Sequence, residues 1–410
     1  MRLLPWLGTT FRSLRFRSFR LFVLGSFFEH SGEFMEMTAL SWLMWKETGS
    51  EVLLGLLFFC RIIPLAVFPL AGGVVADRVN RKGVLIAALI FAAFISATLL
   101  ALVQTDSLSA GFILAAAFAM GLATSFNHPA RSSIVPNLVP REQLMNAVSL
   151  DTTAVFSSMI LGSVMAGQVL AMWGPAPVFA IRIIGLGIAI MWLLMAHIPA
   201  TPSQARAQAV LQNLGGGIAY LRGNRLVMSL LVLFFVPTVF VGSVNALLPT
   251  FADEVLGAGE RGLGYLQGAG GVGSVIAMLT LASLNGVRQK GALLLGAGMA
   301  LGVSILAFSA SPWLVSSLLI QVVTGGVNAA FMTTNVTLTQ SIIPDEVRGR
   351  VMSLREMAGG LGSPVGSLSV GALAGGIGAP QAVAIYGTLC FLLSLGLFIF
   401  LTPVRRIQVA

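Results

Sequence analysis

The chain has 410 residues, of which 56% are hydrophobic and only 10% charged, and its mean hydropathy is +0.92. An ordinary soluble domain carries about 25% charged residues. This composition therefore excludes a soluble protein and indicates an integral membrane protein. The net charge of +9 would suit a nucleic-acid binder, but the cations collect between apolar stretches, as they do in membrane proteins. We therefore expect no nucleic-acid partner.

Long apolar runs recur along the whole chain, and runs of more than about 18 residues are typical of membrane-spanning helices. With short segments between them, they predict an all-α membrane protein with twelve transmembrane helices and no room for a soluble catalytic domain. The predicted spans lie near residues 18–45, 52–76, 84–103, 109–127, 144–172, 177–198, 226–251, 262–284, 290–309, 313–334, 347–374 and 380–402.

Three carboxylates, Glu29, Glu33 and Glu36, lie inside the first predicted span, which Arg20 and Lys46 bracket. At 100° per residue they share one helix face, within about 60° of one another. At that depth an ionised group costs at least a few kcal/mol unless it is paired, hydrated or protonated. We therefore expect at least one of the three to titrate near neutral pH and to bind protons or substrate. Glu33 is the leading candidate because it is central.

His30 and Arg61 complete this predicted proton-coupling or substrate site. His30 lies about 60° from Glu33 around the helix, and imidazole titrates near neutral pH, although a lone histidine is more often only hydrogen-bonded. Arg61 lies in the second span at a depth similar to that of Glu36. An alternative interpretation is therefore a static pair of Arg61 with Glu36 or Glu33 that holds two helices together. Metal binding is disfavoured because all its ligands would come from one helix, and we expect no cofactor.

A polar segment between the second and third spans is predicted to gate the transport path. Its glycine lets helices approach closely, its aspartate can accept hydrogen bonds from a helix N-terminus, and its cations suit the cytoplasmic surface. The residues are Gly73, Asp77, Arg78, Arg81 and Lys82.

An internal repeat divides the chain into two halves. Residues 121–150 align without a gap onto residues 325–354 at an offset of 204, and the same offset places Asp151 on Arg355. We expect both residues at the cytoplasmic gate, in a switching charge network with Asp77; alternatively, they reach the lipid head groups. Arg182 is expected to reach the outer membrane surface.

Such repeats predict two six-helix bundles related by a pseudo-two-fold axis along the membrane normal, with a substrate site between them near the middle of the membrane. The predicted parts are an N-terminal bundle over residues 1–198, a cytoplasmic linker over 199–224 and a C-terminal bundle over 225–410.

The polar segment with Asp77 resembles the loop between helices 2 and 3 of the major facilitator superfamily, although Asn80 replaces the usual Gly. Further motifs are similar to the drug:proton antiporter branch that includes the enterobactin exporter. They begin at Arg17, Asn127, Val139 and Pro344. The resemblance implies proton-driven export of a small, often amphipathic molecule. One departure is that Gly111 to Phe126 contains no arginine, whereas many members have one there, so proton coupling must rest on the acids of the first span.

We therefore expect a secondary active transporter, and no enzyme, that exports a drug or siderophore by alternating access. Two alternatives remain: an uncoupled or import-direction carrier of a metabolite or lipid, and a membrane sensor or scaffold that transports nothing. If both termini lie in the cytoplasm, 20 of the 24 Lys and Arg residues face that side, which favours the inner cell membrane. We expect a monomer surrounded by lipid, with its two cysteines as free thiols.

Overall fold

The computed structural model describes residues 11–68, 81–198, 209–283 and 289–405, and these contain helices and no strand. Short helices are η1 (Arg12–Arg15), η2 (Val135–Asn137), η3 (Arg141–Gln143), α9 (Ala209–Gly223), η4 (Phe251–Val255) and α16 (Thr402–Arg405). The long helices are α2 (Arg17–Thr48), α3 (Glu51–Val67), α5 (Arg81–Gln104), α6 (Ala110–Ile134), α7 (Leu144–Trp173), α8 (Ala176–Met195), α10 (Arg225–Thr250), α11 (Gly259–Ser283), α12 (Lys290–Ser309), α13 (Leu314–Ile342), α14 (Asp345–Ile377) and α15 (Ala379–Phe400).

Each long helix begins within three residues of a predicted span, but two of them end much later than predicted. Helix α6 continues to Ile134 through Asn127 and Pro129, and α13 continues to Ile342. The polar residues near these ends face neighbouring helices, where they find hydrogen-bond partners, so they do not end the helix.

Among the described residues, nine helices are long and apolar enough to cross a membrane. The other three long helices are α2, α3 and α14. Helix α2 carries Glu29, Glu33 and Glu36, α3 has 17 residues, and α14 contains several charged residues. Many large apolar side chains face outward, such as Phe94, Leu279 and Phe400, while carboxylates and arginines lie inside. This reversal of the soluble pattern suits a protein surrounded by lipid.

The first hairpin shows how local chemistry sets the helix ends. Helix α2 ends at Gly49, whose φ of 54° lies in the left-handed region that glycine adopts without strain. The hydroxyl of Ser50 then accepts a hydrogen bond from the backbone N–H of Leu53 at 3.3 Å and caps α3. These two residues turn the chain back, so that α3 packs beside α2.

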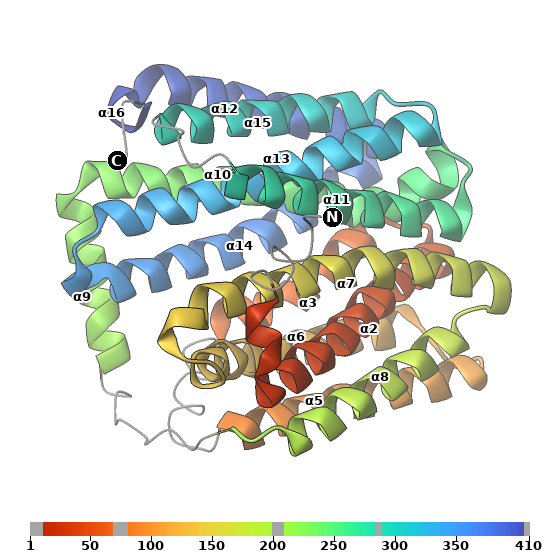
Figure 1. Ribbon diagram of the computed structural model, residues 1–410. Coiled ribbons are helices and arrows are strands. Elements are labelled where there is room, and N and C mark those ends of the chain that lie inside the picture. Colours follow the sequence, from red (N-terminus) through yellow and green to blue (C-terminus); the bar gives the residue numbers. More distant parts are fainter. Residues whose placement is uncertain (1–10, 69–80, 199–208, 284–288, 406–410) are drawn as a thin grey trace, which may run out of the picture.

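The helices pack in two groups (Figure 1). In the first group α2 packs against α7 and α8, α3 against α6, and α5 against α6 and α8. In the second, α10 packs against α14, α11 against α13, and α12 against α13 and α15. Helix α9 lies against α14. The groups meet along two extensive contacts, α3 with α14 and α7 with α11.

Both of these contacts depend on glycines that let two backbones touch. A Cβ added to Gly371 of α14 would lie 2.5 Å from the carbonyl oxygen of Glu51, and 3.0 Å from Cα of Gly55. In the other contact, a Cβ on Gly264 of α11 would lie 2.5 Å from the carbonyl oxygen of Ser163. Only glycine fits at such crossings.

The α3–α14 crossing gives a testable prediction with an internal control. In Gly371→Ala the new methyl group has no space, and we expect a destabilisation of about 1–3 kcal/mol, typical of overpacking. In Gly376→Ala on the same helix, the methyl group meets nothing within 4 Å, so stability should be unchanged or slightly raised. Melting temperatures of the two purified variants test this. Equal melting temperatures would show that the crossing tolerates a side chain.

Candidate functional site

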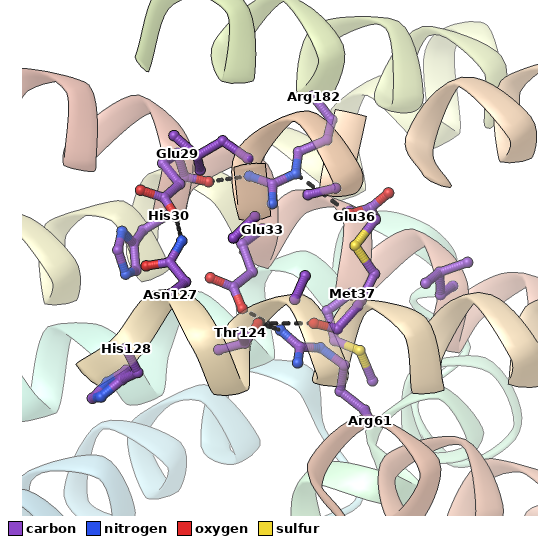
Figure 2. A pocket seen from close by; sticks show the side chains of 16 residues that line it. Glu29, His30, Glu33, Glu36, Met37, Arg61, Thr124, Asn127, His128 and Arg182 are labelled. Atoms are coloured by element: carbon purple, nitrogen blue, oxygen red, sulfur yellow. Dashed lines mark hydrogen bonds and ion pairs between the residues drawn. The ribbon is translucent and has the colours of Figure 1, made fainter. Parts of the chain in front are cut away.

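Glu29, Glu33 and Glu36 of α2 point into one cavity inside the first group of helices (Figure 2). The cavity is lined only by residues between Glu29 and Arg182, from α2, α3, α5, α6 and α8. It therefore lies within the first half of the chain, whereas the sequence suggested a site between the halves. Its polar lining comprises Glu29, His30, Glu33, Glu36, Arg61, Thr124, Asn127, His128 and Arg182.

Glu33 forms an ion pair with Arg61 of α3, which also donates a hydrogen bond to the Thr124 hydroxyl at 3.2 Å. The structure thus contains one of the two pairs that the sequence left open. The Glu33 side chain is 25% exposed and that of Arg61 14%. Of the three glutamates that line the cavity, Glu33 is the most accessible to water.

Glu36 is more deeply enclosed and has a different cation. Its Oε2 lies 3.4 Å from Nε of Arg182, an ion pair without hydrogen-bond geometry, and its Oε1 accepts a hydrogen bond from the Ser96 hydroxyl at 2.8 Å. Arg182 also donates to the backbone carbonyl of Glu29. The expectation that Arg182 reaches the outer surface was wrong. The side chain is 5% exposed because a buried carboxylate and a carbonyl group attract it inward.

Glu29 accepts a hydrogen bond from the side-chain amide of Asn127 at 2.5 Å, and among the described residues the only arginine or lysine within 4 Å of its carboxylate is Arg131, at 3.8 Å. Arg131 makes a closer pair with Asp151 of α7, at 2.6 Å. One guanidinium group therefore serves two carboxylates. Arg131 extends the buried network from α2 to α7.

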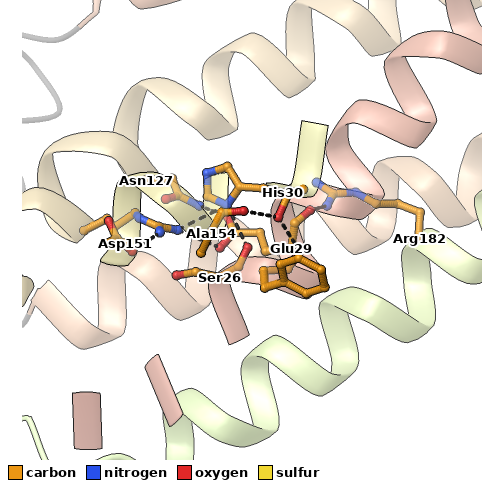
Figure 3. Close-up of polar contacts among 10 residues, drawn as sticks. Ser26, Glu29, His30, Asn127, Asp151, Ala154 and Arg182 are labelled. Carbon is orange, nitrogen blue, oxygen red and sulfur yellow. Dashed lines mark hydrogen bonds and ion pairs between the residues drawn. The ribbon is translucent and has the colours of Figure 1, made fainter. Parts of the chain in front are cut away.

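Figure 3 shows His30 among the polar contacts around Glu29 and Asn127, and its ring also contacts Arg131. Its Nδ1 is 2.8 Å from the carbonyl oxygen of Ser26 and 3.2 Å from Nη1 of Arg131. Nδ1 donates to the carbonyl when it carries a proton, and accepts from Arg131 when it does not. The tautomer of His30 thus decides whether Nδ1 bonds to Ser26 or to Arg131.

The buried network contains more carboxylates than cations. Its four carboxyl groups, on Glu29, Glu33, Glu36 and Asp151, face three guanidinium groups. With the histidines neutral, one negative charge is left over. Because an unpaired charge at this depth is costly, the network favours the uptake of one proton or one monovalent cation.

The cavity volume is about 30 Å³, which holds roughly two water molecules. Pockets for drug-sized molecules measure about 300–1,000 Å³. In this conformation the acids are therefore accessible to water and protons but not to a large substrate. No group of three or more potential metal-binding side chains occurs in the part of the chain that the structure describes.

The predicted gating residues are only partly described. Gly73, Asp77 and Arg78 lie outside the described residues. Arg81 and Lys82 begin α5, where Lys82 donates to the carbonyl oxygens of Leu194 at 3.0 Å and Ala196 at 2.9 Å. This contact joins the start of α5 to the end of α8.

Asp151 and Arg355 have separate partners in this structure. Asp151 pairs with Arg131, whereas Arg355 of α14 bonds to Asn335 and Glu356. Sequence reasoning did not single out Arg131, although the repeat contains the signal. At an offset of 204, the pair Arg131 and Asp151 falls on Asn335 and Arg355. Both copies are hydrogen-bonded pairs.

A family model of transmembrane secretion effectors matches residues 8–409. The chain belongs to this family of the major facilitator superfamily. Macrolide efflux protein A of Streptococcus pyogenes is 26% identical over 328 residues, which cover 78% of this chain and 80% of that protein. The enterobactin exporter EntS of Shigella boydii serotype 18 is 26% identical over 342 residues, 83% of this chain and 81% of that protein.

Two solved structures resemble the fold of this family member at low sequence identity. The first is a bacterial homologue of the lysosomal transporter Spinster in an inward-facing, unoccupied conformation, with a TM-score of 0.74, 13% identity and coverage of 95% of this chain and 98% of that one. The second is a D-xylose–proton symporter, with a TM-score of 0.72, 17% identity and the same coverage. Together with the family, the relatives confirm a multi-pass efflux transporter rather than an enzyme.

Proposed function

We propose that this protein exports a small amphipathic compound from the cytoplasm in exchange for protons, by alternating access. The observation that carries this proposal is the buried network of the first half, which has one carboxylate in excess and lines a cavity of water size. Uptake of a single proton would neutralise the network. Ion pairs that only hold the helices together would need neither a cavity nor an excess negative charge.

Glu33 is proposed as the proton-binding residue. It is the most exposed of the three glutamates, and its partner Arg61 also holds Thr124 of α6. Protonation would weaken the pair and leave Arg61 free to shift between α2 and α6. Proton binding would thereby alter the contact of three helices.

The proposed architecture has twelve spans in two six-helix bundles, residues 1–198 and 225–410, joined by a linker over 199–224. Helix α9 forms most of the described part of that linker and packs on α14. The distribution of Lys and Arg supports an inner-membrane location with both termini in the cytoplasm. Asp77, Asp151 and Arg355 remain proposed members of the cytoplasmic gate.

With that orientation, several contacts between the bundles lie at the external end. Asp253 accepts hydrogen bonds from Lys46 at 2.8 Å and from the indole N–H of Trp45 at 2.9 Å. In α11, Tyr265 accepts one from Gln168 at 2.6 Å. Together with the glycine crossings, these contacts support an external side that is closed in this conformation.

Reconstituted vesicles test the proposal directly. Purified protein is placed in liposomes that contain a pH-sensitive dye, and a labelled macrolide serves as the probe because one relative is a macrolide efflux protein. We expect macrolide to accumulate when protons can flow in the opposite direction, and the lumen pH to change with it. If macrolide accumulation did not depend on the pH gradient, the result would favour the alternative of an uncoupled carrier. No flux of the macrolide or of further amphipathic probes would favour the sensor or scaffold.

A further inference from the structure

Arg355 is a buried cation in the second half of the chain, far in sequence from the acidic network. It is 2% exposed, its Nε donates to Oδ1 of Asn335 at 2.9 Å, and its guanidinium carbon lies 3.7 Å from the ring centre of Phe234. Nη1 donates to Glu356 at 2.5 Å. Nη2 is buried and has no hydrogen-bond partner among the described residues.

A buried N–H group of a charged side chain is costly to leave without an acceptor, more so than a neutral one. Such groups in native proteins call for a specific explanation, for example a bound water or ion. The first half of the chain contains the corresponding pair with its charges matched. At the repeat offset, Arg131 pairs directly with Asp151, whereas Arg355 has only the neutral Asn335 at the matching position. The second half thus lacks a buried acid at the place where the first half has one.

The remaining polar contact of Arg355 is with Glu356, a residue at the surface of the protein. The side chain of Glu356 is 70% exposed, yet its carboxylate touches Nη1. Glu356 lies one helical turn from Gly360, which faces Ala66 of α3. The position that its carboxylate occupies therefore opens toward the first half of the chain, on the side where a transported molecule would pass.

We infer that Arg355 anchors a carboxylate-binding site for the transported compound, and that Glu356 occupies this site when no compound is bound. Since Nε is taken by Asn335, the free edge of the guanidinium is the fork of Nη1 and Nη2. A carboxylate fits this fork with two parallel hydrogen bonds. Glu356 makes one of them, so an incoming carboxylate gains the bond that Nη2 lacks. The inference rests on the proposed efflux function and adds that compounds with a carboxylate are among the cargo.

Binding of salicylate to the full-length protein in phosphatidylcholine nanodiscs tests the inference, with salicylamide as the uncharged probe of matched shape. We expect salicylate to bind and salicylamide to bind much more weakly. Arg355→Gln should weaken salicylate binding by about tenfold or more, the value of a charged hydrogen bond. Glu356→Gln should tighten it by about two- to fivefold, because it removes an exposed competitor. Arg225→Gln, at an exposed arginine of the same half, should change nothing.

The two variants should change the affinity for salicylate in opposite directions, which misfolding would not do. Glu356 is exposed, so its replacement should leave the fold intact. Equal binding of salicylate and salicylamide would overturn it. So would an unchanged affinity in Glu356→Gln, or no binding to any variant, which would mean that Nη2 is bonded only to a buried water molecule. Because this experiment needs no proton gradient, its failure is distinguishable from a failure of proton-coupled efflux.

Discussion

Glu33→Gln is expected to reduce proton-driven accumulation of substrate by about tenfold or more. Glutamine keeps the shape of the side chain and can still accept a hydrogen bond from Arg61, but it binds no proton at neutral pH. The buried network then has three carboxylates facing three guanidinium groups, so it no longer favours the uptake of a proton. Flux of substrate and movement of protons should become independent of each other.

The measurement is the ratio of protons to labelled macrolide moved in vesicles. Glu47→Gln is the matched control, because Glu47 is exposed near the end of the same helix, and it should keep the ratio of the wild-type protein. If Glu33→Gln also kept that ratio, Glu33 would have no part in coupling. Glu29, which shares its cation with Asp151, would then be the next residue to replace.

Arg182→Gln is expected to destabilise the protein by about 3–5 kcal/mol, the cost of leaving one partner of a buried ion pair without its counter-charge. Arg182 and Glu36 are 5% and 4% exposed, and Ser96 alone would remain to bind the Glu36 carboxylate. The carbonyl oxygen of Glu29 would also lose its guanidinium donor. A lower melting temperature and poor yield of folded protein should follow.

A double variant separates this charge effect from a loss of packing. Adding Glu36→Gln to Arg182→Gln removes the stranded carboxylate, so most of the lost stability should return. Arg222→Gln, at an exposed arginine of α9, should leave the melting temperature unchanged. If the double variant were as unstable as Arg182→Gln alone, the role of Arg182 would be steric, consistent with its close contact to Gly32.

The helices could be predicted because hydropathy is a local property of the sequence. Runs of apolar residues marked every long helix to within three residues at its start. The ends of α6 and α13 were missed because their polar residues, such as Asn127 and Asn335, bond to other helices. Whether a polar residue ends a helix depends on the partners that it finds, and those partners are distant in sequence.

The sequence by itself determined the family, the helical membrane fold and the helix that carries the acids, since each depends on residue type and spacing along the chain. Only the tertiary structure decided which cation meets which carboxylate. Arg61, Arg131 and Arg182 come from three different helices, and no periodicity relates them to α2. The pairing of these three arginines leaves one carboxylate in excess in the first half of the chain. In the second half, the buried guanidinium group of Arg355 is incompletely hydrogen-bonded. Both features follow from how helices pack across hundreds of residues, because the energy of a buried charge is set by its neighbours in space.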